Sequence, residues 1–400
     1  MPRLADIKSC TGCLACVDVC ARGALVSTYN SEGHISFDVV TNKCVECGLC
    51  EKVCPVVSDF HYGTNSLKDS KPFAAWCKDS ELRAKSTSGG VFAALAKYVI
   101  SNGGIVIGAS MRHNLIRHVA IEKIEDLYLL QGSKYAQSDT NGIYKTTKKL
   151  LQSGQTVLFS GLGCQVAALL SYLGDRKYSG ELFTLDLICG GVPSRFIIDY
   201  FLRENTEVDE IVAFRNKSKY EFSVKLRDGK IKVIPLSERP FPLCGFYTEL
   251  TNRYSCYDCK FNGAHRLSDI TIGDYWGDAQ FVEQHKKGLS IAVAHSKRGE
   301  SLMKHAGIEL HETEWDNFLM HNPRMIDGYK NKSNSKVRLY LAEAFKSYSY
   351  EKLLQTYANK ATWKQPLSMV RKVYRYIRGS IEGKFYLTRL SKEIEKLKNQ

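Results

Sequence analysis

Residues 10–20 have the sequence CTGCLACVDVC, and residues 44–55 have the sequence CVECGLCEKVCP. Both runs share the spacing C-x2-C-x2-C-x3-C, which places eight of the 14 cysteines within the first 54 residues. A cubane 4Fe–4S cluster is held by four thiolates, and in bacterial two-cluster proteins the fourth cysteine of each run ligates the other cluster. The spacing therefore predicts two clusters, the first on Cys10, Cys13, Cys16 and Cys54 and the second on Cys20, Cys44, Cys47 and Cys50.

Zinc knuckles also use C-x2-C pairs, but a third cysteine in register and a fourth beyond it, repeated twice, favour clusters. Gly12 and Gly48 stand where the backbone must pass close to a cluster, which glycine allows because it has no side chain. Between the runs, residues 24–29 and 34–39 alternate apolar and polar side chains and predict two short strands. We expect residues 1–60 to form a small ferredoxin-like two-cluster domain, followed by a linker over residues 61–71.

The length of 400 residues exceeds the roughly 100–200 residues of one typical domain, so two or three domains are expected. No apolar stretch approaches the ~20 residues of a membrane-spanning helix, and the N-terminus does not resemble a signal peptide. We therefore expect a cytoplasmic protein. In that reducing compartment, closely spaced cysteines are metal ligands more often than disulfides.

The net charge of +14 is unevenly distributed, because residues 331–400 hold 16 Lys and Arg against 5 Asp and Glu. Four amphipathic helices with basic faces are predicted there, over residues 336–345, 350–357, 367–377 and 387–397. This basic helical extension could contact anionic lipid at a membrane surface or an acidic redox partner such as ferredoxin. The commoner explanation is an extension that packs on the body with a solvated basic face. No motif indicates nucleic-acid binding.

Residues 72–330 predict an α/β body in which strands and helices alternate. The predicted strands are 105–110, 115–122, 156–160 and 181–188, and the predicted helices are 91–100, 141–151, 164–173 and 194–202. Such alternation is typical of a largely parallel sheet, with ligands bound in the loops that follow the strands. A hairpin over residues 222–236, turning at Asp228 and Gly229, predicts that the sheet is mixed.

Four more cysteines fall in loops of this body. Cys164 and Cys189 stand alone at turns between a strand and a helix, whereas Cys256 and Cys259 form one C-x2-C pair. They could assemble a third cluster from distant segments, or they could be small apolar residues at buried turns. Cys77 and Cys244 are interpreted as structural.

Six motifs in this order resemble the family of coenzyme F420 hydrogenase/dehydrogenase beta subunits: KSTSGG at 85–90, GSKY at 132–135, FSGLGCQ at 159–165, LICGGVPS at 187–194, CYDC at 256–259 and DITIGDYWG at 269–277. The resemblance implies a body that binds FAD beside an iron–sulfur cluster. It assigns that third cluster to Cys164, Cys189, Cys256 and Cys259. Relatives oxidise reduced F420 or use ferredoxin electrons to reduce chlorophyll-type substrates, and many bacterial members belong to surface-polysaccharide gene clusters.

Two positions depart from the family pattern. Gly163 precedes Cys164 and Gly190 follows Cys189, where relatives usually carry Cys-Pro-adjacent and Cys-His-Gly forms. The missing histidine removes a candidate proton carrier beside the third cluster.

The flavin is expected where a helix begins, because unpaired N–H groups and the helix dipole favour a pyrophosphate. This predicts contacts from Ser86, Ser88, Gly89 and Gly90, with an ordinary N-cap at Ser88 as the alternative. Ser133 and Lys134 are expected at the same site, where Lys134 would hold phosphate or the isoalloxazine ring unless it is simply an exposed lysine.

Asp274 and Trp276 end an apparent strand, where they would shield the flavin or merely pack in the core. Lys134 and Asp274 are the predicted catalytic residues. The glycine pairs at 103–104 and 190–191 do not fit the dinucleotide fingerprint, so no Rossmann NAD site is predicted.

The sequence thus predicts an oxidoreductase that passes electrons between a substrate or F420-like donor, FAD, 4Fe–4S clusters and a ferredoxin-type partner, with polysaccharide assembly as a candidate pathway. The alternative is a non-catalytic electron-transfer subunit that feeds a separate catalytic subunit.

Overall fold

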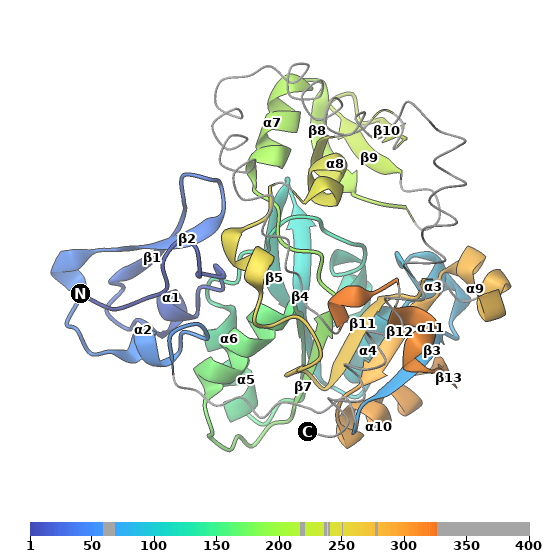
Figure 1. Cartoon of the computed structure of the whole chain (residues 1–400), viewed down its shortest axis with the longest axis horizontal. Helices are drawn as coiled ribbons and strands as arrows, with labels where there is room; N and C mark the ends of the chain where they lie inside the picture. The colour runs from blue at the N-terminus through green and yellow to red at the C-terminus, as the bar shows by residue number, and fades with distance from the viewer. Residues whose placement is uncertain are drawn as a thin grey trace.

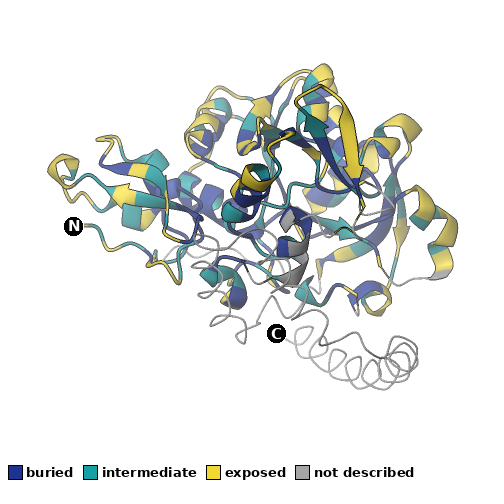
Figure 2. Ribbon diagram, turned by 90° about the horizontal axis from the view of Figure 1, so that it is seen from above, coloured by how far each residue is buried: buried dark blue, intermediate teal, exposed yellow. Residues whose placement is uncertain are grey.

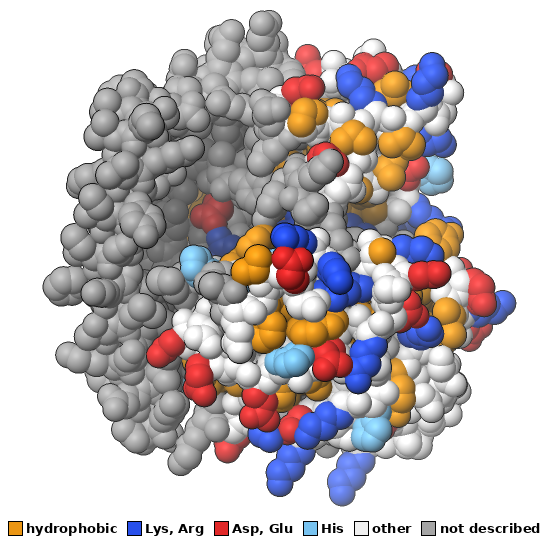
Figure 3. Space-filling view, turned by 90° about the vertical axis from the view of Figure 1, so that its right-hand side faces the viewer, with side chains coloured by type: hydrophobic (Ala, Val, Ile, Leu, Met, Phe, Trp, Pro, Cys, Tyr) orange, Lys and Arg blue, Asp and Glu red, His pale blue; other side chains and the backbone are white. Residues whose placement is uncertain are grey.

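The computed structural model describes residues 1–58, 69–216, 221–235, 238, 241–249, 251–276, 279–319 and 321–325. The predicted basic extension over residues 331–400 lies outside these residues, and so does most of the expected linker. On the face shown in Figure 3, acidic and basic side chains are interspersed over the described part of the chain.

An eight-stranded sheet forms the centre of the body, in the order β13-β3-β12-β11-β7-β6-β4-β5. The strands are β3 (Lys71–Cys77), β4 (Ile105–Arg112), β5 (Leu115–Ile121), β6 (Val157–Gly161), β7 (Leu182–Leu187), β11 (Ile270–Asp274), β12 (Ser290–Ala294) and β13 (Ile308–Glu312). Only the four neighbours β4, β6, β7 and β11 pair in parallel, and the other pairings are antiparallel. The expected mixed sheet is confirmed, but the expectation that it is largely parallel holds only for its centre.

Helices cover both faces of this sheet (Figure 1). Val106 and Leu158 pack with α4 (Val91–Ser101) and α10 (Lys297–His305). Their neighbours Ile107 and Phe159 point to the other face and pack with α5 (Ile143–Gln152) and α6 (Gly163–Leu173). This alternation follows from the two-residue period of a strand, and it buries the central strands from both sides (Figure 2).

A second, smaller sheet lies above the main one in Figure 1. It contains β8 (Val208–Ala213), β9 (Phe222–Leu226) and β10 (Ile231–Ile234), accompanied by α7 (Phe196–Glu204) and α8 (Phe241–Thr248). The predicted hairpin at Asp228 and Gly229 is therefore present, and Gly229 has the positive φ of +85° that such a turn requires. The expectation that it extends the main sheet is wrong, because β9 pairs with β8 and β10 instead. The remaining α-helices of the described body are α3 (Ser80–Ala84), α9 (Val282–Lys287) and α11 (Trp315–Leu319).

The N-terminal segment lies at the left of Figure 1 and is built from α1 (Ala15–Val19), β1 (Leu25–Tyr29), β2 (Ile35–Val39) and α2 (Leu49–Lys52). Both predicted strands are confirmed, and they pair antiparallel from Leu25 with Val39 to Tyr29 with Ile35. The segment does not have a separate hydrophobic core. Cys13, Ala15 and Val53 are buried in the same cluster as α5 and α6.

A candidate iron–sulfur and cofactor site

The first set of cysteines converges as its spacing predicts. Cys10, Cys13, Cys16 and Cys54 all line one small cavity in the N-terminal segment. Burial raises the pKa of the Cys13 thiol to about 12, and it also raises the pKa values of Cys10 and Cys16. Gly12 donates its backbone N–H to the sulfur of Cys10 at 3.3 Å. A Cβ at Gly12 would lie 2.5 Å from the Ile35 oxygen, and its φ is +65°, so only glycine fits this turn.

The second set lies nearer the surface. Cys47 is exposed, whereas Cys20, Cys44 and Cys50 are half-buried. The backbone N–H of Ala24 donates to the Cys20 sulfur at 3.3 Å. Burial and the other three cysteines of the first set are the largest causes of the raised pKa of Cys16, and Cys50 of the second set raises it further. The two N-terminal sets are therefore neighbours.

Cysteines of the body come together from three separate segments. Cys164 lies in the first turn of α6, Cys189 follows β7, and Cys256 and Cys259 lie in and just after the 3-10 helix Tyr254–Asp258. Burial raises the pKa of Cys256 to about 12 and that of Cys259 to about 11, and neighbouring cysteines of the same set add to both shifts. For Cys164, the other three cysteines are the next largest causes of its raised pKa after burial.

A 4Fe–4S cluster and a single metal ion require different spacings between their ligands. Within the described residues, no three His, Cys, Asp or Glu side chains converge closely enough to hold one metal ion. A cubane presents four separate irons, so its thiolates stand further apart than the ligands of one ion. Backbone N–H groups of Gly191 and Phe261 donate to the sulfurs of Cys189 and Cys259 at 3.3 and 3.4 Å, contacts of the kind that stabilise thiolate ligands.

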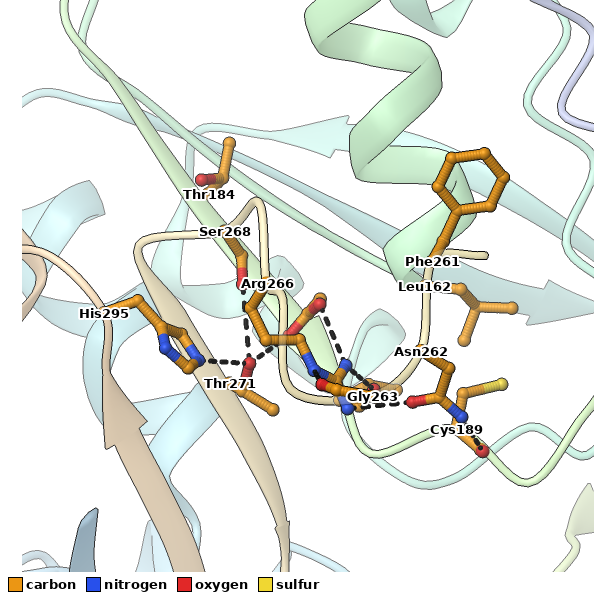
Figure 4. Close-up of polar contacts among 12 residues, drawn as sticks. Leu162, Thr184, Cys189, Phe261, Asn262, Gly263, Arg266, Ser268, Thr271 and His295 are labelled. Atoms are coloured by element: carbon orange, nitrogen blue, oxygen red, sulfur yellow. Dashed lines mark hydrogen bonds and ion pairs between the residues drawn. The ribbon is translucent and has the colours of Figure 1, made fainter. Parts of the chain in front are cut away.

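A buried polar network supports the loop that carries Cys189 (Figure 4). Asn262 donates to the carbonyl of Cys189 at 2.9 Å and accepts from Arg266 at 2.8 Å. Arg266 pairs with Asp186 at 3.1 Å, and both side chains are at most 2% exposed. Thr271 joins this carboxylate to His295, and burial lowers the pKa of His295 to about 3. The network therefore holds the loop of Cys189 in place. Its side chains are either neutral, as in Asn262 and His295, or ion-paired, as in Arg266 and Asp186.

A cavity of about 730 Å³ opens beside Cys189, which is a size typical of small-molecule and cofactor sites. It lies past the carboxyl ends of β6, β7 and β11, where ligands of parallel sheets are expected. Seven of the eight predicted cofactor-binding and catalytic residues line it: Ser86, Ser88, Gly90, Ser133, Lys134, Asp274 and Trp276.

The loop before α4 differs in detail from the prediction. Gly90, with φ of +80°, is the N-cap, and Ser88 instead donates to the carbonyl of Leu289 at 2.8 Å. The alternative of an N-cap at Ser88 is therefore wrong. Gly89 is packed against the sheet, because a Cβ there would lie 2.5 Å from the oxygen of Ala75. The loop can pack this closely against β3 because glycine has no side chain.

Lys134 is half-buried in the wall of the cavity. Its ammonium donates to the carbonyls of Leu130 at 3.0 Å and Gln131 at 2.8 Å. Burial lowers its pKa to about 7. The alternative of a merely exposed lysine is wrong, because the side chain is half-buried in the cavity wall and donates to backbone carbonyls.

Sequence reasoning missed Arg215, which organises one side of the cavity. Its guanidinium forms a bidentate pair with Asp274 at 2.8 and 3.0 Å and donates to the carbonyl of Thr87 at 3.3 Å. Tyr135 also contacts Arg215 and stacks on Phe246, with ring centroids 4.1 Å apart. Arg215 belongs to no recognised motif, so only its position just after β8 could have drawn attention to it.

His118 and Arg324 were also missed. His118 lines the cavity and bonds to Ser138 and to the Ser160 carbonyl, and burial lowers its pKa to about 4. A Cβ at Gly190 would lie 2.8 Å from Nη1 of Arg324. The guanidinium of Arg324 therefore lies beside Gly190, the position at which the resemblance leads us to expect histidine. It is ion-paired with Glu249.

The fold and the N-terminal cysteine pattern define an iron–sulfur protein with a mixed α/β body. Residues 9–57 match a 4Fe–4S dicluster domain. Residues 72–145 and 154–315 match the N- and C-terminal parts of the coenzyme F420 hydrogenase/dehydrogenase beta subunit, which together span more than half of the chain. The chain belongs to this family.

Two known proteins are similar to the chain. It is 23% identical over 253 residues to a subunit of the F(420)H(2) dehydrogenase of Methanosarcina mazei, covering 59% of this chain and 70% of that protein. A chain of the F420-reducing [NiFe] hydrogenase complex from Methanosarcina barkeri is 19% identical with a TM-score of 0.43, covering 70% of this chain and 89% of that one. Among the described helices, none has the length and apolar character needed to cross a bilayer.

Proposed function

We propose that this chain is a flavin-dependent iron–sulfur oxidoreductase that moves electrons between a substrate in the large cavity and a redox partner at the N-terminal segment. The observation that carries this proposal is a continuous series of neighbours. Cys189 lines the cavity, Cys164 of the same set interacts electrostatically with Cys13, and Cys16 interacts with Cys50. The series leads to Cys47 at the surface.

The cavity fits a flavin dinucleotide. Residues 91–93, the first turn of α4, line it, and the first N–H groups of a helix have no partner within the helix. Together with the helix dipole they favour a pyrophosphate. Tyr135, Phe246 and Trp276 supply aromatic surface for a ring system, and the guanidinium of Arg215 holds Asp274 in a fixed orientation.

A flavin, when bound, supplies the conversion between hydride chemistry and single-electron transfer, which cubane clusters cannot perform alone. The chain's own contribution is a base of suitable strength. Lys134, with a pKa of about 7, can take up or release a proton near neutral pH. Because F420 is the cofactor named in the family, an F420-like deazaflavin is the first substrate to test.

The partner is proposed to bind around Cys47. Val45 is 60% exposed and Leu49 is 46% exposed on either side of this cysteine. Exposed apolar side chains beside a surface ligand suit a transient contact with a ferredoxin-type protein or a catalytic subunit.

The domain limits 1–60, 72–330 and 331–400 are part of the proposal. So is a role in polysaccharide assembly, which rests on the resemblance to bacterial family members alone. A gene neighbourhood rich in glycosyltransferases supports that role, and an adjacent gene for a large hydrogenase subunit contradicts it.

Anaerobic purification followed by iron, sulfide and flavin analysis tests the central proposal. Three clusters require about twelve iron atoms per chain, four for each cluster, together with one flavin. A preparation with about eight irons or fewer, which is at most two clusters, or one without flavin, contradicts it.

The second candidate function is a non-catalytic electron-transfer subunit, which the description of the M. mazei relative as a dehydrogenase subunit favours. Dithionite or reduced ferredoxin, supplied to the isolated chain with oxidised F420, separates the two. Turnover by the chain alone favours the enzyme, and turnover only after a catalytic subunit is added favours the electron-transfer role.

A further inference from the structure

Arg253 lies buried between the body cysteines and the first N-terminal set. We propose that its positively charged guanidinium acts on two clusters at once and raises the reduction potentials of both. The same side chain holds the N-terminal segment against the body. The inference rests on the proposed function, because it requires clusters in both sets.

The contacts of Arg253 join the two parts of the chain. Its side chain is 2% exposed. It donates to the carbonyl of Cys10 at 3.2 Å, to the carbonyl of Ile35, and to the amide oxygen of Gln137 at 2.6 Å. Gln137 in turn donates to the carbonyl of Thr11 at 2.9 Å. Arg253 and Gln137 together therefore hold the loop of the first cysteine run.

The neighbouring thiols come from both cysteine sets. Those that interact electrostatically with Arg253 are Cys10 and Cys13 of the N-terminal segment and Cys164 and Cys256 of the body. Cys256 is three residues away along the chain, and its backbone N–H donates to the Arg253 carbonyl. The guanidinium therefore lies close to predicted ligands of both clusters.

The charge of Arg253 is not neutralised by its acceptors. In the described residues these acceptors are two carbonyls and an amide, whereas the equally buried Arg266 is paired with the carboxylate of Asp186. Arginine stays protonated in proteins. A buried positive charge acts over a longer range than an exposed one because water screens it less.

The consequence concerns the reduced state. Each cluster gains one negative charge when it accepts an electron, so a nearby cation favours reduction and raises the potential. Because Arg253 lies near both clusters, it raises both reduction potentials and keeps the difference between them small. The largest electrostatic influences on Arg253 come from Cys10, Cys13, Cys164 and Cys256, so the cluster of Cys20, Cys44, Cys47 and Cys50 is expected to be affected least.

The test is an EPR-monitored redox titration of the full chain carrying Arg253→Gln. We expect two of the three cluster potentials to fall, each by about a tenfold change in the reduction equilibrium, or about 59 mV for one electron, while the third changes least. Arg253→Lys keeps the charge and should restore most of the shift. Arg83→Gln is the matched control, because Arg83 is also buried and bonds to the carbonyl of Gly288, and the cysteine that influences it is Cys77, which is not a predicted cluster ligand.

Gln137→Glu provides a second, independent variant. It leaves Arg253 in place but gives it a carboxylate acceptor, so both potentials should again fall. If Arg253→Gln loses iron, Gln137→Glu decides the question. Intact clusters with unchanged potentials in Gln137→Glu, or a shift of only one cluster, overturn the inference but leave the proposed function standing. A wild-type chain without three clusters overturns the proposed function itself.

Discussion

The N-terminal cysteines and the body cysteines reach similar arrangements by different routes. The eight N-terminal cysteines come from two short runs within the first 54 residues, and four of them, Cys10, Cys13, Cys16 and Cys54, line one cavity. The four body cysteines come from three segments between residues 164 and 259, and they meet only because the sheet places the ends of β6 and β7 side by side. The N-terminal sites are thus encoded locally, whereas the body site depends on the whole fold.

Removing one predicted ligand of the body cluster should produce the largest difference in iron content between the two regions. We expect Cys189→Ala to lose up to about four irons per chain, the content of one cluster, because the body cluster loses one of its four thiolate ligands. The N-terminal segment should keep about eight irons, since its ligands lie elsewhere. Iron and sulfide analysis of anaerobically purified protein measures this difference.

Cys77→Ala is the control, because Cys77 is also buried but belongs to none of the three sets. It should retain all of the iron. Equal losses in the two variants would mean that the iron content follows general destabilisation and that Cys189 is not a ligand.

The buried network behind Cys189 tests whether the body site depends on the fold. Arg266→Gln leaves the carboxylate of Asp186 buried without its ion pair, which typically costs about 3–5 kcal/mol. We expect the free energy of unfolding to fall by this amount in denaturant titrations, with body iron released before N-terminal iron. The exposed pair Lys286 and Glu283 supplies the control, since Lys286→Gln should change stability by less than about 1 kcal/mol. Simultaneous release of all iron from Arg266→Gln would refute the difference between the regions.

The same contrast explains what could be predicted from the sequence. Strands β1 and β2, helices α4 to α6 and the central parallel strands are predictable because each has a clear local period or turn signal. Strands β3 and β13, at one edge of the sheet, are not, and β11 is recognised only through its DITIGDYWG motif. The pairing of β3 with β12 and β13 joins segments more than 200 residues apart, so no local pattern indicates it.

The candidate site shows the same limit. Motifs identify Lys134, Asp274 and the serines of residues 86–88, because these stand in loops next to glycines. They do not identify Arg215, which reaches Asp274 from the second sheet across 59 residues of sequence. Gly89, which the sequence predicts to contact the ligand, is not among the residues that line the cavity, and a Cβ there would lie 2.5 Å from the oxygen of Ala75. Sequence patterns identify which loops carry the site, and tertiary contacts decide what each side chain does there.

Lys134 provides a test that concerns the body alone. Its pKa of about 7 lies below the ordinary lysine value of 10.5, so it is charged below pH 7 and neutral above. We expect affinity for an anionic flavin to weaken by up to about tenfold as the pH rises through 7, measured by fluorescence titration. Lys134→Arg, which stays charged, should remove this pH dependence.

Stability gives an independent measurement on the same lysine. Between pH 7 and 10.5 the unfolded chain binds a proton that the native chain does not, so the free energy of unfolding should rise with pH in that window. Lys134→Met should abolish this contribution. An unchanged pH profile in the variant would show that the native lysine keeps its ordinary pKa.

The smallest predicted effect concerns the contact that joins the two regions. Asp18, in α1, accepts backbone N–H groups of Gly142, at 2.5 Å, and Tyr144, at 3.0 Å, at the start of α5. Asp18→Ala removes this cap and should cost about 1 kcal/mol. Asp79→Ala removes a cap within the body, at α3, and should cost a similar amount. Hydrogen exchange then distinguishes them, because only Asp18→Ala should increase exchange in residues 10–20. If both variants leave that segment equally protected, its position is fixed by its own cysteine ligands and by Arg253, and the cap of α5 contributes to the stability of the body alone.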